Sequence, residues 1–210
     1  MNRKIYAAKN DLKAQKRLYL FLITVILLGI ISGIVYTFFL DKDSKIKVLE
    51  SIETYFYLIK NSTSINYIKS LSSSCFINIA YLLLIWLLGI SLIGFPIIVI
   101  ILFFKSFIIG FSVSSIIMKY GLKGLFGSFL YVFPHQIVML IIYLLVSFYS
   151  INFCYKLFKY LFFKKTINFK YSMDKYVKIL IISSIISIIT TLYEVFISTY
   201  LMKLFTLTLK

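Results

Sequence analysis

Three polar residues fall inside apolar runs that otherwise suit a lipid environment. Lys105 lies in PIIVIILFFKSFIIGFSVSSIIM, a run that starts at Pro96, and His135 and Gln136 lie in the run 125–150. A charged side chain near the bilayer centre costs roughly 2.5–3.5 kcal/mol on insertion scales. A lysine ammonium offers three donors, and neutral imidazole and amide groups can accept them. These residue types predict either a buried polar site or a contact that holds two helices together.

Residue counting places the three side chains at one depth. Lys105 lies roughly 14 Å into its run, and His135 and Gln136 lie roughly 15–17 Å into theirs, at 1.5 Å per residue. In a hydrocarbon core about 30 Å thick, all three are near the midplane. Pro134 predicts a helix kink and a further acceptor, because its ring leaves the carbonyl of Leu130 without a helical donor. We therefore predict an intramembrane polar cluster of Lys105, His135 and Gln136.

This predicted cluster has two interpretations. In the functional one, it is a small pathway, a proton-responsive switch or a contact for a partner. In the structural one, Lys105 joins two helices or snorkels toward an interface. Intramembrane hydrogen bonds contribute only roughly 0.6 kcal/mol on average, which favours the structural interpretation. Glu194, the only acid inside an apolar run, lies roughly 12 Å nearer the outer surface than Lys105 by the same count, so we do not pair the two.

Long apolar runs are the elements that must position these residues. Of the 210 residues, 61% are hydrophobic, whereas a soluble domain has about 45–50%. A spanning helix needs about 20 mostly apolar residues, and continuous apolar runs favour helices over strands. We predict one all-α domain over 1–210, a polytopic integral membrane helical bundle with about five transmembrane helices at 18–40, 74–93, 96–118, 125–150 and 177–202.

The distribution of charge predicts the orientation. The tail 1–17 and the loop 151–176 each carry six Lys or Arg against one acid. With five spans the two segments share one side, which the positive-inside rule makes the cytoplasm. The loop 41–75 then lies outside, although its five lysines weigh against this N-in/C-out topology. Apolar periodicity predicts amphipathic helices at 46–59 and 153–165, either interfacial helices on the lipid bilayer or plain connectors.

Glycine and proline predict where the spans turn. Gly89 and Gly94 supply backbone freedom and Pro96 opens the next helix, which predicts a tight cytoplasmic hairpin. The stretch 119–124 is nearly as short, so the three central spans must be antiparallel neighbours. Longer connections leave the first and fifth spans freer in their placement.

Gly29 and Gly33 match the small-xxx-small pattern of close helix packing. We predict helix packing at these two glycines, and the pattern also allows a homo-oligomer.

Signatures of catalysis are absent from the sequence. It contains no G-x-x-x-x-G-K-[ST], H-E-x-x-H or G-x-S-x-G motif. Cys75 and Cys154 lack the spacing of metal ligands, and one histidine is too few for a His-rich site. The net charge of +16 resides mainly between apolar runs, which fits membrane surfaces better than nucleic acid. We predict a protein that is not an enzyme, with no catalytic residue, metal, cofactor or nucleic-acid partner.

One block, 81–137, carries family-like motifs in order. They are Trp86-Leu-Leu-Gly89, Ser91, Ile93-Gly94-Phe95-Pro96, Phe104-Lys105-x-Phe107, Gly110-Phe111, Gly121 and Pro134-His135. In order and spacing this block resembles the stage II sporulation protein M family. That family often reads Pro-His-Gly-x-x-Glu, whereas this chain has Met139 at the Glu position. A proton-handling role for that acid therefore does not carry over, and the structural interpretation of Lys105 and His135 is favoured.

The resemblance implies a non-enzymatic scaffold in the mother-cell membrane at the sporulation septum. Such a scaffold would recruit two peptidoglycan-cleaving partners, sporulation proteins D and P of the same stage, during engulfment. The loop 41–75 would be its external docking surface. The alternative is a permease-like transport component that pairs with a cytoplasmic ATPase, for which the polar cluster and the hairpin 89–96 are the support.

Overall fold

The computed structural model describes the chain except residues 1, 62–66, 92, 164–168, 199 and 202–210. For residues 2–14, 59–61, 67, 129–133, 163, 169 and 198 it describes the backbone but not the side chains. Its elements are α1 (Asn2–Phe38), α2 (Lys42–Asn61), α3 (Tyr67–Ile90), α4 (Gly94–Phe163), α5 (Phe169–Tyr193) and a short π-helix, η1 (Glu194–Ser198). No strand occurs in this described part. The all-α prediction is therefore confirmed.

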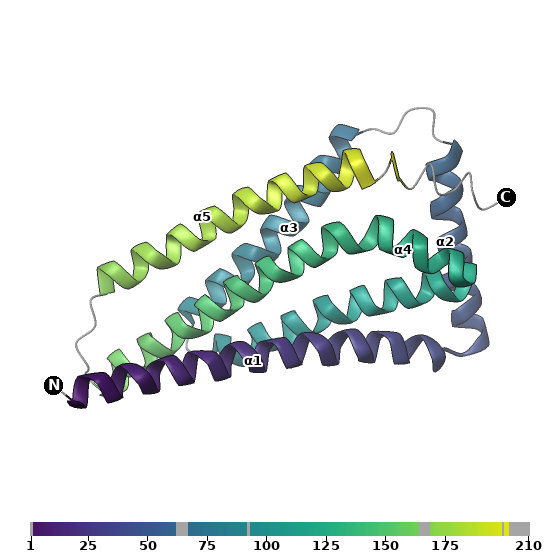
Figure 1. Ribbon diagram of the computed structural model, residues 1–210. Helices are drawn as coiled ribbons and strands as arrows, with labels where there is room; N and C mark the ends of the chain where they lie inside the picture. The colour runs from purple at the N-terminus through teal and green to yellow at the C-terminus, as the bar shows by residue number, and fades with distance from the viewer. Residues whose placement is uncertain (1, 62–66, 92, 164–168, 199, 202–210) are drawn as a thin grey trace.

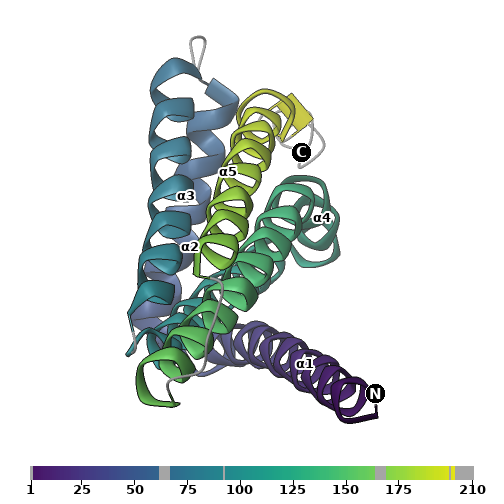
Figure 2. The same cartoon turned by 90° about the vertical axis from the view of Figure 1, so that its left-hand side faces the viewer.

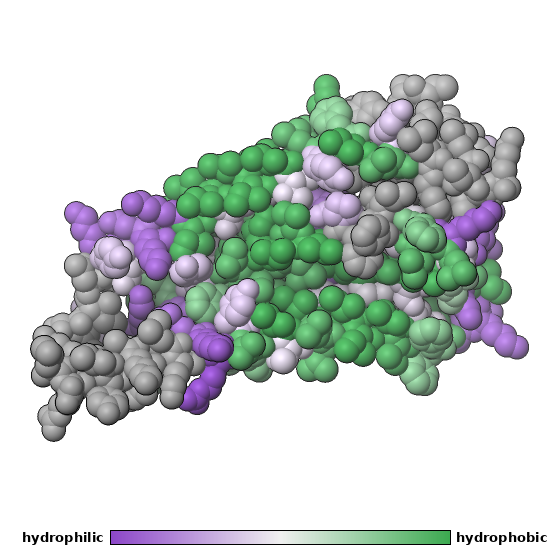
Figure 3. Space-filling view, in the orientation of Figure 1, coloured by the Kyte–Doolittle hydropathy of each residue, from purple (hydrophilic) through white to green (hydrophobic). Residues whose placement is uncertain are grey.

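Five helical stretches are long and apolar enough to cross a membrane, which confirms the predicted bundle. They are Gln15–Phe38, Ile68–Ile90, Gly94–Ser128, Pro134–Phe162 and Lys170–Ile197. An apolar belt covers the middle of the molecule in Figure 3, with hydrophilic residues at both ends. In Figures 1 and 2, α1 and α5 start, and α4 finishes, at the same end of the molecule, which we call the basic end. Helix α2 and the bend within α4 lie at the opposite end of the molecule, which we call the α2 end. The basic end carries Lys16, Arg17, Lys156, Lys159, Lys170 and Lys175.

Helix α4 holds two spans in one element and reverses direction between them (Figure 1). Gly121 has φ 58° and ψ −138°, a backbone conformation that essentially only glycine adopts. The turn predicted over 119–124 is therefore concentrated in one residue, and the flanking residues remain helical. Pro134 lies within the second helical half of α4, so its kink stays a prediction.

The segments 41–75 and 151–176 are mostly helix, and their description as loops is wrong. Helix α2 occupies most of the first segment, and α3 begins at Tyr67, because no Gly or Pro interrupts 67–75. In the second, α4 continues to Phe163 and α5 starts at Phe169, which leaves only a short connection.

Helix α2 includes the helix predicted over 46–59 and begins just after Asp41. The backbone N–H of Ser44 donates to Oδ2 of Asp41 at 3.3 Å, as at a helix N-cap. Hydrogen bonds from the side chain and then the backbone of Ser44 lower the pKa of the Asp41 carboxyl. On the predicted apolar face, Phe56 is buried and Leu49 and Ile52 are half-buried; the side chain of Ile59 lies outside the described residues.

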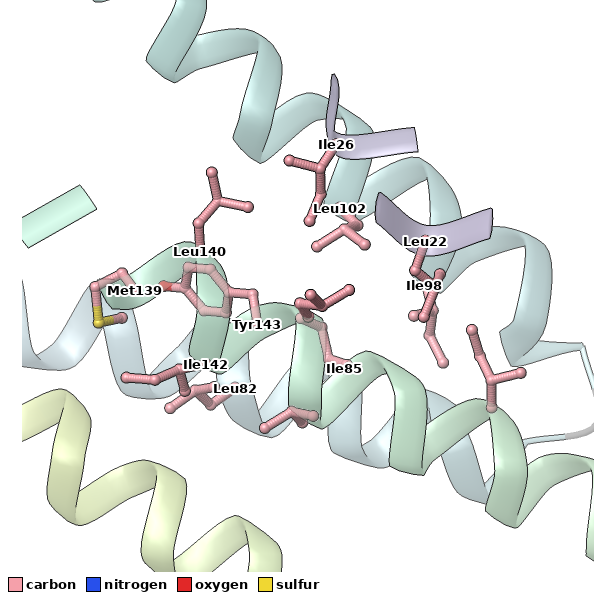
Figure 4. Packing of buried hydrophobic residues seen from close by; sticks show 13 residues of the cluster. Leu22, Ile26, Leu82, Ile85, Ile98, Leu102, Met139, Leu140, Ile142 and Tyr143 are labelled. Carbon is pink, nitrogen blue, oxygen red and sulfur yellow. The ribbon is translucent and has the colours of Figure 1, made fainter. Parts of the chain in front are cut away.

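The hydrophobic core lies where α1, α3 and both halves of α4 meet (Figure 4). The sequence left the first span freer in its placement, and the structure places α1 along the first half of α4. The core residues labelled in Figure 4 are Leu22, Ile26, Leu82, Ile85, Ile98, Leu102, Met139, Leu140, Ile142 and Tyr143.

Candidate functional site

Lys105 lies on the first half of α4 and turns its ammonium to aromatic rings. Its Nζ lies 3.5 Å from the ring centroid of Tyr81 on α3 and 5.5 Å from that of Tyr143 on the second half of α4. A cation over an aromatic face is attracted by the ring quadrupole, by about 2 kcal/mol or more when water is excluded. The two tyrosines therefore stabilise the charge that the apolar surroundings disfavour.

Tyr143 continues this contact into a line of buried polar side chains. Its hydroxyl donates to Oδ1 of Asn78 at 3.3 Å, and Nδ2 of Asn78 donates to Oγ1 of Thr191 at 3.1 Å. The Thr191 hydroxyl in turn donates to the carbonyl of Ser187 at 2.8 Å. Tyr143, Asn78 and Thr191 are all buried. The line therefore joins α4, α3 and α5 across the interior of the bundle.

A second polar contact joins His135 to Glu194. Nε2 of His135 lies 3.1 Å from Oε2 of Glu194, and the histidine side chain is only 5% exposed. Glu194 is the first residue of η1, where the helix widens from α to π geometry. Single π-helical turns within α-helices are frequent at functional sites. This pair ties the end of α5 to the second half of α4.

The predicted cluster of Lys105, His135 and Gln136 is arranged differently from the sequence-based interpretation. In the described part of the chain, no hydrogen bond joins Lys105 to His135 or Gln136, and Gln136 is half-buried. Lys105 contacts tyrosines instead, and His135 contacts Glu194. The side chain of Leu130, next to the predicted acceptor carbonyl, lies outside the described residues.

Sequence reasoning missed Tyr81, Tyr143, Asn78 and Thr191. Residue counting gives depth along a helix but not which face a side chain occupies, so it did not identify these partners. Asn78 was the available signal, because an amide inside the apolar run of a span needs a hydrogen-bonding partner.

The hairpin between α3 and α4 packs against α5 through one hydroxyl. The Tyr176 hydroxyl donates to the carbonyl of Trp86 at 2.6 Å and lies 2.8 Å from the hydroxyl of Ser150. A Cβ on Gly89 would collide with both Tyr176 and Ser150, and a Cβ on Gly94 would collide with the carbonyl of Leu88. Both glycines therefore permit close approach at this turn.

The rest of the turn is short. The N–H of Gly94 donates to the carbonyl of Ser91 at 3.1 Å. Pro96 lies in the first turn of α4, where a helix leaves backbone N–H groups without an internal partner.

Gly29 and Gly33 lie on the face of α1 that contacts α4. A Cβ on Gly29 would collide with Ser106 and the carbonyl of Phe103, and a Cβ on Gly33 would collide with the carbonyl of Phe107. Gly110 approaches the backbone of Ile30 in the same way from α4. The small-residue pattern is therefore used within this chain.

The model of the stage II sporulation protein M family covers residues 19–199. The chain belongs to the stage II sporulation protein M family. Comparisons with curated proteins and with solved structures found no match. This family is not a known enzyme family. Membership in it, together with five candidate membrane spans, identifies the chain as a multi-pass sporulation membrane protein.

The residues that carried the resemblance to the stage II sporulation protein M family lie at three structural positions. Most of them form the hairpin at the basic end, the contact of α4 with α1, and the reversal at Gly121. Lys105 and His135 instead face Tyr81 and Glu194 inside the bundle. Met139, at the position of the family's Glu, is 1% exposed and packs in the hydrophobic core. Among described residues, no group of three or more His, Cys, Asp or Glu could hold a metal ion. The described polar residues inside the bundle therefore form contacts between helices, among them the pair His135 and Glu194.

Proposed function

We propose that this protein is a non-enzymatic membrane scaffold of the sporulation engulfment complex. In this role it sits in the mother-cell membrane at the septum and engulfing membrane, with α1 starting in the cytoplasm. It recruits and localises peptidoglycan-cleaving sporulation proteins D and P there, and so directs peptidoglycan remodelling. The family match over residues 19–199 carries the proposal.

Helix α2 supplies a docking surface suited to this role. It is held at the α2 end by Phe56, which is 5% exposed and whose ring lies 5.1 Å from that of Tyr120. Nζ of Lys119 also lies 2.7 Å from Oε2 of Glu53, but this pair is exposed and contributes little. The next two residues of the helix, Tyr57 and Leu58, turn away from this contact and are 64% and 60% exposed. Tyrosine is enriched among the residues that dominate protein–protein binding.

Affinity purification of the tagged protein from sporulating cells tests the proposal. The test variant is Tyr57→Ser/Leu58→Ser on α2, which leaves Phe56 in place. We expect it to recover at least tenfold less of the two hydrolases than the unaltered chain, because loss of central interface anchors costs about 2 kcal/mol or more and about 1.4 kcal/mol is a tenfold change. Mass spectrometry quantifies the recovered partners.

The matched control is Tyr160→Ser/Leu161→Ser, the same residue pair at the basic end, with exposures of 48% and 58%. It should recover the hydrolases normally. Equal loss in both variants contradicts docking on α2. Recovery of an ATPase with no hydrolase, from the unaltered chain, contradicts the scaffold and favours the transport component.

A further inference from the structure

A groove of about 520 Å³ opens at the basic end between the start of the α1 span and the two ends of α4. Its walls are apolar and come from distant parts of the sequence, namely Leu18, Phe95, Ile151 and Phe158. Phe158 is 42% exposed, so part of its ring faces away from the protein. The groove lies at the ends of the candidate spans Gln15–Phe38, Gly94–Ser128 and Pro134–Phe162. This is the depth at which a lipid chain joins its headgroup.

The rim of this groove is cationic. Lys156 and Lys159 line it, and Nζ of Lys159 lies 4.3 Å from the ring centroid of Tyr155, which holds the ammonium at the groove. Lys16 and Arg17 lie between Gln15 and Leu18 of α1, which both line the groove. Among the residues whose side chains are described, no acid lines it.

The floor of the groove is a rigid part of the fold. Cys154 is buried and its Sγ donates to the carbonyl of Ser91 at 3.3 Å, which joins the end of α4 to the α3–α4 turn. Nδ2 of Asn152 donates to the carbonyl of Phe148 at 2.9 Å. These two hydrogen bonds fix Cys154 and Asn152 at the floor of the groove.

We propose that this groove binds an anionic phospholipid, with an acyl chain against Leu18, Phe95 and Phe158 and the phosphate near Lys156 and Lys159. The charge of the rim matches a phosphate headgroup, and the apolar walls match a hydrocarbon chain. Basic pockets between membrane helices bind anionic headgroups in this way. The groove is also within the 300–1,000 Å³ range of small-molecule sites. The site does not depend on the scaffold role proposed above.

Thermal unfolding of the full chain in neutral detergent tests the site, with phosphatidylglycerol or phosphatidylcholine of identical acyl chains added. The test variant is Lys156→Gln/Lys159→Gln. We expect phosphatidylglycerol to bind it about 30-fold more weakly than the unaltered chain, which is about 2 kcal/mol at 1.4 kcal/mol per tenfold change, from about 1 kcal/mol for each lysine.

The matched control is Lys170→Gln/Lys175→Gln, which removes the same charge from the same end but outside the groove. It should keep the affinity for phosphatidylglycerol within about threefold, because bulk surface charge is screened beyond a Debye length of about 8 Å at physiological salt. Raising the salt to 1 M should weaken the preference of the unaltered chain for phosphatidylglycerol.

Two results would overturn the proposal. One is equal weakening in both double variants, which would show attraction by bulk charge. The other is equal stabilisation of the unaltered chain by phosphatidylcholine and phosphatidylglycerol, which would show that the rim does not recognise the headgroup.

Discussion

Glycines bring helix α1 against α4, with one buried hydroxyl pair beside them, Thr37 and Ser114 at 2.6 Å. Helix α5 contacts α3 and α4 through several polar side chains. At the first contact, Gly29 and Gly33 bring the α1 backbone against carbonyls of α4. At the second, Thr191 receives a hydrogen bond from Asn78, and Glu194 lies 3.1 Å from His135. Both contacts lie within candidate membrane spans.

The difference reflects how helices associate in lipid. Lipid tails are as apolar as leucine, so burying apolar side chains between helices contributes little to helix association. Close packing and interhelical hydrogen bonds stabilise the association instead. The α1 contact depends on shape, so added volume should disrupt it. The α5 contact depends on pairing, so removing one partner should disrupt it more than removing both.

The largest effect should come from His135→Leu at the α5 contact. Removing the imidazole takes a 3.1 Å contact away from the buried Oε2 of Glu194. Loss of a partner by a buried polar atom costs about 1–3 kcal/mol, and we expect a loss of about 3 kcal/mol in free energy of unfolding. The double variant His135→Leu/Glu194→Leu should recover most of this loss. Unfolding in detergent measures both, and strictly additive losses would show that the two residues do not act as a pair.

Gly33→Leu at the α1 contact should follow, with a loss of about 2–3 kcal/mol from overpacking. The new side chain would collide with the carbonyl of Phe107, which belongs to a rigid backbone. The control Val35→Leu also adds volume to α1, but at a side chain that is 43% exposed. It should stay within about 0.5 kcal/mol. Similar unfolding curves for the two variants would mean that α1 does not depend on shape.

Asn78→Leu should have a smaller effect on the α5 contact. It removes two hydrogen bonds, to Tyr143 and Thr191. At roughly 0.6 kcal/mol for each intramembrane hydrogen bond, we expect a loss of about 1 kcal/mol. Ile77→Leu on the same helix, at a side chain that is 48% exposed, is the control and should change little. A loss above about 3 kcal/mol would mean that the polar line acts as one cooperative network.

Lys105→Met should have the smallest effect on stability. The lost attraction to Tyr81 and Tyr143, about 2 kcal/mol, is offset by removal of a charge that costs roughly 2.5–3.5 kcal/mol in the membrane centre. We expect stability to stay within about 1 kcal/mol or to rise. Hydrolase recovery in the pull-down separates the two interpretations of Lys105. Normal recovery supports a structural contact, and loss of recovery in a stable variant supports a functional one.

The sequence by itself determined the class of the protein and the places of its turns. Composition and run length were enough for five spans, because a spanning segment must be long and continuously apolar. Gly29 and Gly33 marked a close helix contact, but the sequence could not tell whether the partner helix was α4 or a second copy. Helical signals in 46–59 also predicted α2 in part.

Only the tertiary structure decided which polar groups meet. Rise per residue placed Lys105 and His135 at similar depths, yet helix rotation directs one toward Tyr81 and the other toward Glu194. The start of η1 at Glu194 and the reversal confined to Gly121 depend on the packing of neighbouring helices. The groove at the basic end likewise unites residues from 18 to 158, because its walls come from helices that are adjacent in space and remote in the chain.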